Sequence, residues 1–112
     1  MKKPLSKPAK KEEAIYIART TAEDREHAEF IGRALVESKT AVSVHIREIT
    51  SIFQWEGAVD QMTEYEVVII CKEPEKAKEI IGKYHTYKLP EFIYVKLDCS
   101  DDILKWCTTW CK

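Results

Sequence analysis

The segment HTYKLPE, residues 85–91, contains the side chains of this sequence best suited to chemistry. A neutral imidazole from His85 and a carboxylate from Glu91 form a ligand pair that suits Cu(II) or Zn(II). Two ligands from one chain do not close a metal site, so further donors would have to come from elsewhere. The favoured alternative is that His85 and Tyr87 are structural groups that hydrogen-bond across a cleft.

The segment QWEG, residues 54–57, is a second candidate region. Trp55 is large enough to anchor in a pocket of a neighbouring subunit, and we predict that Trp55 and Tyr65 lie at a subunit interface. With Tyr87, the side chains of Trp55 and Glu56 are predicted to line a ligand cleft. Packing remains the favoured role of Trp55.

Acidic side chains could supply oxygen ligands to the same cleft. Glu56 and Glu64 are the candidates, with Arg19 or Lys88 as counter-charges. For each glutamate alone, an exposed and solvated carboxylate is the favoured alternative.

Two of the four cysteines are four residues apart in LKWCTTWCK. On a helix this spacing places Cys107 and Cys111 on one face, where a soft-metal pair is conceivable. Free cysteines are among the most buried residues and two tryptophans flank the pair, so core packing is favoured. No CxxC spacing and no export signal are present, which indicates reduced thiols.

Length and charge limit the function classes. The 112 residues fit one domain, predicted over 14–112, and 45% apolar residues suffice for a core. A net charge of -1 gives no general attraction for nucleic acid. No apolar run approaches a membrane span or a secretory signal, so we expect no membrane partner and a cytoplasmic location. Residues 1–13, with five lysines and two prolines, are predicted to be a disordered basic tail.

The apolar periodicity predicts four strands and three helices. The strands are expected at 14–20, 42–53, 64–71 and 92–97, with a bulge or bend in the second. The first helix is expected to start from a capping box formed by Thr20 and Thr21 with Glu23 and Asp24, and to end near Lys39. Further helices are expected from Pro74 to about Tyr84 and after a Ser100 cap.

This order, β-α-β-β-α-β plus a terminal helix, predicts an α+β fold of the split βαβ type. An antiparallel sheet would be covered on one face by helices. The other face carries apolar and aromatic residues with no helix left to cover them. Such a patch usually marks an interface, so the sequence predicts self-association.

Three ordered motifs resemble the CutA divalent-cation-tolerance family: TTAEDREHAEFIGRALVE at 20–37, TSIFQWEG at 50–57 and HTYKLPE at 85–91, with Trp106 in the last helix. The resemblance implies a ferredoxin-like subunit in a tight homotrimer, with long hairpin strands pairing across subunit edges. It also implies a role in copper tolerance, in which His85 matches the proposed copper contact. Thr20 and Ser43 occupy positions where relatives carry cysteine, so sulfur ligation is reduced here.

Taken together, these features predict a trimeric protein that binds a divalent cation or small ligand at inter-subunit clefts. An enzyme is not expected, because no Ser-His-Asp order, phosphate loop or nucleophile elbow is present. The alternative is a signalling or scaffold trimer, resembling PII-like regulators, that binds a partner protein.

Overall fold

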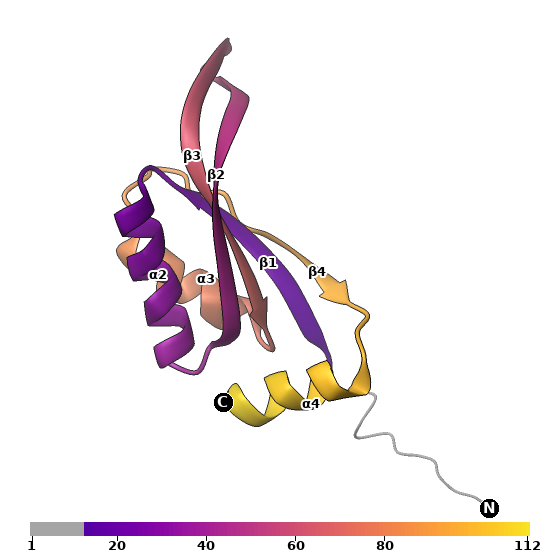
Figure 1. The fold of residues 1–112 in the computed structure, drawn as a ribbon. Helices are drawn as coiled ribbons and strands as arrows, with labels where there is room; N and C mark the ends of the chain where they lie inside the picture. The colour runs from indigo at the N-terminus through magenta and orange to yellow at the C-terminus, as the bar shows by residue number, and fades with distance from the viewer. Residues whose placement is uncertain (1–12) are drawn as a thin grey trace, which may run out of the picture.

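The computed structural model describes residues 13–112, and the predicted tail lies outside this range apart from the exposed Glu13. Four strands and three helices follow the chain as in Figure 1: β1 (Ile15–Ala22), α2 (Arg25–Glu37), β2 (Ala41–Trp55), β3 (Ala58–Cys71), α3 (Pro74–Tyr84), β4 (Ile93–Leu97) and α4 (Asp101–Trp110). Within residues 13–112, none of the helices has the length and apolar character needed to cross a membrane.

The strands form one antiparallel sheet in the order β2-β3-β1-β4. This order confirms the predicted α+β, ferredoxin-like topology. β1 lies in the centre, paired with β3 from Tyr16 opposite Cys71 to Ala22 opposite Tyr65, and with β4 on its other side. The centre of the sheet therefore holds the first and third strands of the chain.

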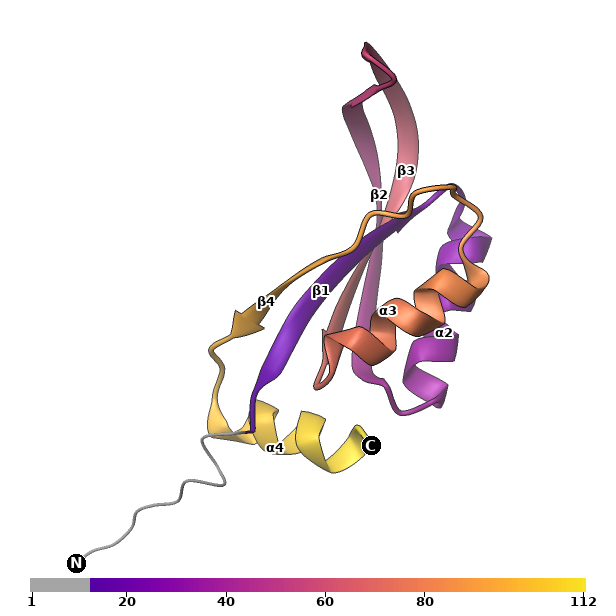
Figure 2. The same ribbon diagram turned by 180° about the vertical axis from the view of Figure 1, so that it is seen from behind.

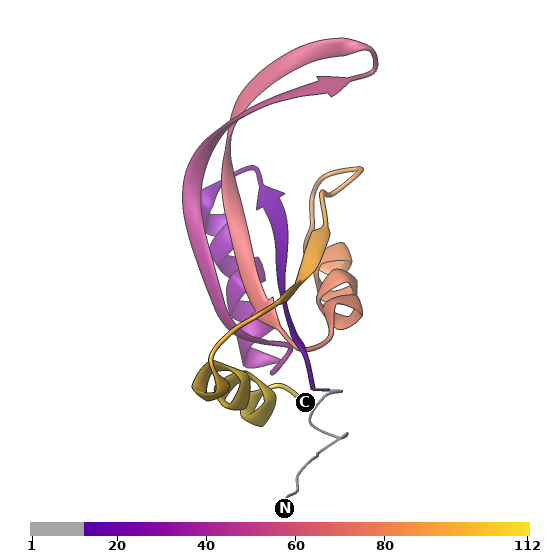
Figure 3. The same ribbon diagram turned by 90° about the vertical axis from the view of Figure 1, so that its right-hand side faces the viewer.

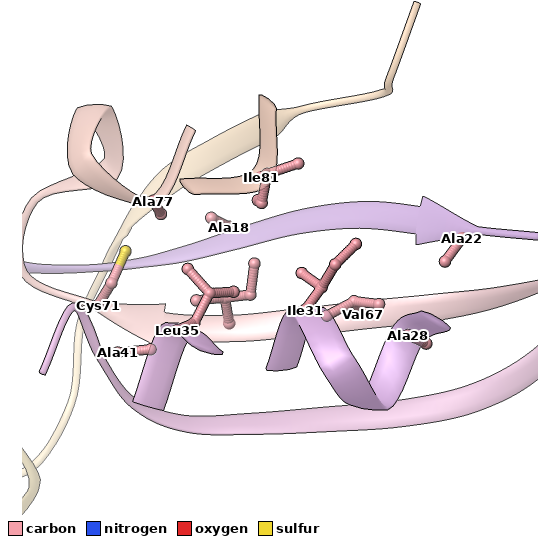
Figure 4. Packing of buried hydrophobic residues seen from close by; sticks show 11 residues of the cluster. Ala18, Ala22, Ala28, Ile31, Leu35, Ala41, Val67, Cys71, Ala77 and Ile81 are labelled. Atoms are coloured by element: carbon pink, nitrogen blue, oxygen red, sulfur yellow. The ribbon is translucent and has the colours of Figure 1, made fainter. Parts of the chain in front are cut away.

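The main core lies between the sheet and helices α2 and α3, which pack side by side on one face (Figure 2). Leu35 and Ile31 of α2 are fully buried against Val67 and Ile69 of β3. Figure 4 shows these aliphatic side chains meeting between the helices and strands. Burying each large aliphatic side chain stabilises the fold by about 1.5–3 kcal/mol, so this layer holds the domain together.

The final helix, α4, packs on the opposite face of the sheet. Cys107 and Cys111 join Ile15 and Val42 in a second buried cluster, which confirms the predicted packing of both cysteines. The expectation that no helix remained for this face was therefore wrong at the end distant from the hairpin tip (Figure 1). Trp110 fixes the helix there by donating its indole N–H to the Val36 carbonyl at 3.2 Å.

The start of α2 differs from the prediction. Its N-cap is Asp24, whose Oδ1 accepts a hydrogen bond from the His27 backbone N–H at 2.7 Å. Thr20 and Thr21 instead continue β1 and are buried. The capping-box prediction was wrong because the strand runs on for two residues, and Asp24 is an equally good N-cap type.

β2 and β3 are longer than predicted and form a hairpin from Ala41–Cys71 to Trp55–Ala58. The bulge lies between Ala41 and Ser43, near the start of β2. Glu56 and Gly57 form a two-residue turn with φ of 51° and 84°. Positive φ at both turn positions suits the right-handed twist of a hairpin and favours glycine at the second.

The outer hairpin, residues 49–64, extends beyond the end of β1, so its two strands pair only with each other in the described chain (Figure 3). The Cα radius of gyration is 16.4 Å, whereas a compact domain of this size has about 13 Å. The outer hairpin accounts for this elongation.

Candidate functional site

A groove of about 770 Å³ lies where the outer hairpin leaves the domain, between the hairpin, β1 and the loop before β4. Its charged lining consists of Arg19, Asp60, Glu64, Lys88 and Glu91, and its apolar lining includes Ile49, Phe53, Trp55, Met62 and Leu89. The groove therefore combines a mixed-charge floor with apolar walls, as small-ligand sites commonly do.

Beside the groove, two guanidinium groups hold one carboxylate. Arg19 donates from Nε to Glu66 Oε2 at 2.5 Å, and Arg47 donates from Nε to Glu66 Oε1 at 2.6 Å. The hydrogen bond from Arg19 is the main cause that holds the pKa of Glu66 below its usual range. Arg19 also donates from Nη1 to Glu91 at 2.5 Å, so it bridges Glu66 and Glu91. Both oxygens of Glu66 are thus engaged within the chain.

Glu64 has a different environment, although it lies on the same face of β3. It is 7% exposed, and its Oε2 accepts a hydrogen bond from the Tyr87 hydroxyl at 2.7 Å. Burial, together with this hydrogen bond, raises the pKa of Tyr87, so the phenol remains a donor. Among residues 13–112, no basic side chain lies within ion-pairing distance of Glu64. It is a buried carboxylate without a cationic partner in the described part of the chain, and burying such a charge is costly unless something compensates it.

His85 fixes the loop that carries Tyr87. Its Nε2 lies 2.5 Å from the Thr21 carbonyl, which can only accept, so Nε2 carries the proton. Its Nδ1 accepts a hydrogen bond from the Tyr87 backbone N–H at 3.0 Å. Burial lowers the pKa of His85, which favours this neutral form. Because both ring nitrogens are engaged, a metal would have to displace one of these bonds.

The groove brings together six of the residues that the sequence suggested for the cleft: Arg19, Trp55, Glu64, Tyr87, Lys88 and Glu91. His85 and Glu56 do not line it; Glu56 is exposed in the hairpin turn. Tyr65 packs against the main core, with the Arg25 guanidinium 5.2 Å from its ring centre.

Within residues 13–112, no three or more histidine, cysteine, aspartate or glutamate side chains are grouped so that they could hold a metal ion. The described part of a single chain therefore contains no closed metal site, and the predicted pair of His85 and Glu91 stays a prediction.

Sequence reasoning missed Glu66 and Arg47. The alternation of residues in β3 could have indicated Glu66, because it places Glu64 and Glu66 on one face of an inner strand. In the sheet, Glu66 pairs directly with Arg47 of β2. His27, on α2, is half-buried, and its Nε2 is buried without a hydrogen-bond partner in the described structure.

The structure defines a ferredoxin-like α+β domain with a protruding hairpin and a groove at the base of that hairpin. Within that class, the CutA1 divalent ion tolerance protein family model matches residues 16–109. The chain belongs to this family of divalent-cation tolerance proteins.

Individual relatives agree. The divalent-cation tolerance protein CutA of Pyrococcus horikoshii is 30% identical over 95 residues, covering 82% of this chain and 93% of the relative. The CutA protein of Archaeoglobus fulgidus is 37% identical over 79 residues, covering 68% and 74%. The crystal structure of CutA from Xylella fastidiosa superposes with a TM-score of 0.83 at 26% identity, covering 88% of this chain and 98% of that one.

Proposed function

We propose that this chain assembles into a homotrimer that binds a divalent cation or small ligand in the groove, which neighbouring subunits complete. It acts as a cytoplasmic binding protein and not as an enzyme. The observation that carries the proposal is the outer hairpin, which residues 13–112 of a single chain leave largely uncovered.

The outer hairpin has the surface of an interface. Ile52 is 67% exposed, Val59 80% and Trp55 44%, although all three are large apolar residues. A two-stranded hairpin is marginally stable by itself, and clustered exposed apolar side chains usually mark a contact surface. A second copy packed on this hairpin would stabilise its two strands and would bury the exposed apolar side chains.

The edge of the sheet supports the same assembly. Within residues 13–112, the 15-residue strand β2 pairs only with β3, so its other edge presents free backbone donors and acceptors. The opposite edge strand, β4, has only five residues. A long unprotected edge is a template for pairing with another chain, and pairing between copies would satisfy it.

The groove's carboxylates support the cation. No basic side chain of residues 13–112 pairs with Glu64, and Asp60 and Glu91 line the same groove. A divalent cation would compensate Glu64, with the remaining ligands coming from a second subunit. The family name also points to divalent cations. Copper is the ion that the motif resemblance favours, although carboxylate oxygens alone do not select it over other divalent ions.

Calorimetric titration with Cu(II) and with Zn(II) tests the proposal on two matched variants. Glu64→Gln keeps the hydrogen-bond acceptor for Tyr87 but removes the charge, so affinity should fall roughly tenfold or more. Glu56→Gln removes an exposed carboxylate outside the groove lining and should leave the isotherm unchanged. Equal isotherms for the wild type and Glu64→Gln would contradict the cation site.

A further inference from the structure

A second group of potential ligands lies at the end of the sheet distant from the hairpin tip. Cys107 Sγ and Cys111 Sγ are 3.8 Å apart on the inner face of α4. Cys107 is fully buried and Cys111 is 3% exposed. Ile15, Val42 and partly buried neighbours surround them with apolar surface. Neither thiol belongs to the groove, so their pairing is independent of the proposed function.

The backbone between the two cysteines argues against a direct disulfide. The Cys111 N–H donates to the Cys107 carbonyl at 2.9 Å, so the last turn of α4 is intact. Residues four apart on a helix have Cβ atoms about 5–6 Å apart. A disulfide needs a Cβ separation of about 3.5–4.5 Å. Oxidation would therefore require the last turn to unwind.

An ion between the two sulfurs requires less rearrangement. Two metal–thiolate bonds of about 2.3 Å span at most about 4.6 Å when they are collinear. The sulfurs would have to separate by less than 1 Å from their 3.8 Å contact, which side-chain rotation can supply. Thiolates select soft ions, among them Cu(I). We propose that Cys107 and Cys111 form a two-coordinate site for a thiophilic monovalent cation, represented by Cu(I).

The proton and charge balance of this site can be stated. Burial raises the pKa of the Cys107 thiol to about 12, so this thiol is protonated in the metal-free chain. One monovalent cation replaces the two thiol protons, which leave to solvent, and the bis-thiolate complex carries one negative charge. Lys39 lies near this end of the sheet, with its Nζ 4.0 Å from the centre of the Trp110 ring that packs on the cluster.

Entry to the site is provided by the end of the helix. Cys111 is the C-cap of α4, and helix ends fray more readily than helix centres. Its thiol donates a 3.4 Å contact to the Thr40 carbonyl, which metal binding would replace.

An anaerobic titration of the full chain with Cu(I), in competition with the chromophoric chelator bicinchoninate, tests the site. We expect the wild type to hold one Cu(I) per chain, and Cys111→Ala to hold none at the same chelator concentration. Cys99→Ala is the matched control, because Cys99 is an exposed thiol outside the pair, and it should behave as the wild type.

Retention of Cu(I) by Cys111→Ala, loss in Cys99→Ala, or failure of the wild type to compete with the chelator would each overturn the proposal. Circular dichroism verifies that Cys111→Ala is folded. If that variant does not fold, X-ray absorption of the copper-loaded wild type decides. Two sulfur neighbours alone support the site, and any nitrogen, oxygen or third sulfur neighbour overturns it.

Discussion

The two halves of the β2–β3 hairpin belong to the same pair of strands, but they differ in the strands and helices that pack against them. The inner half, residues 41–48 with 65–71, has β1 beside it and α2 across it. The outer hairpin has neither, and it exposes Ile52 and Val59. The inner half therefore has both the added backbone pairing with β1 and the greater side-chain burial, and we expect it to be the more stable half in an isolated chain.

The two halves also contribute differently: the inner half contributes to the core, and the outer half contributes to the groove. The inner half provides the fully buried residues Val67 and Ile69, whose role is packing. The outer half provides the groove wall and the free edge. Glu66 and Glu64 lie at the junction. Two arginines neutralise Glu66, whereas Glu64 has no ion pair among the described residues. At this boundary, the hairpin contributes the carboxylate of Glu64 to the groove, whereas Glu66 is held outside its lining.

The largest expected effect is on the α2 side chains that pack across the inner half. Leu35→Ala removes a fully buried side chain and should lower the free energy of unfolding by about 2–5 kcal/mol, measured by urea denaturation. In the outer hairpin, Ile52→Ala should change it by less than about 0.5 kcal/mol at protein concentrations too low for assembly. Its effect should then grow with concentration, because assembly buries the residue. Equal effects of both variants at low concentration would break the comparison.

A smaller effect is expected at the junction. Glu66→Gln should lower the free energy of unfolding by about 1–3 kcal/mol at neutral pH, because charge-assisted hydrogen bonds are lost. The effect is limited because Arg47 is largely exposed and its ion pair is screened by solvent. Arg19 and Arg47 lower the folded-state pKa of Glu66 below its usual value near 4.5. Its contribution is therefore complete above about pH 4.5 and lost as pH falls through the lower folded value.

The unfolding free energies of the wild type and Glu66→Gln should accordingly converge below pH 4.5 in a denaturation series. Glu56→Gln serves as the control. It removes an exposed carboxylate in the turn, so the free energy of unfolding should change little at any pH. A constant difference between the wild type and Glu66→Gln at every pH would show that Glu66 acts through shape and not through charge.

Much of the fold could be predicted from the sequence. The alternation of residues 64–71 and the stripe of Ala77, Ile80 and Ile81 identified their elements, because periodicity reports burial directly. Element ends were less accessible, since Thr20, Thr21 and Asp24 are all capping types and only tertiary contacts select among them. The length of the outer hairpin was underestimated for a different reason. Residues 58–63 lack the regular apolar alternation that would predict a strand.

The candidate site was only partly accessible to sequence reasoning. Trp55, Tyr87 and Glu91 were identified by residue type and do line the groove. The engagement of both His85 nitrogens was not accessible, because it depends on the distance from His85 to Thr21, 64 residues away in the chain. The same holds for the two arginines on Glu66, which come from different strands.

The smallest expected effect is at the hairpin tip. Gly57 has a φ of 84°, and a Cβ there would meet nothing within 4 Å, so Gly57→Ala strains only the backbone. We expect a cost of about 1–2 kcal/mol confined to the turn. Hydrogen exchange should show faster exchange in residues 49–64 and unchanged protection in the inner half. Equal loss of protection in both halves would mean that the hairpin unfolds as a single unit.

The most direct test of the account is the native mass of the full chain, measured by light scattering over a 100-fold range of protein concentration. We expect three times the 13.0 kDa chain mass for the wild type, and loss of that species in Ile52→Asp, which places a charge on the outer hairpin. The exposed aromatic Phe30 on α2 supplies the control, because Phe30→Ala should remain trimeric. A wild type that is monomeric throughout the range would contradict the central claim that copies of this chain cover the outer hairpin.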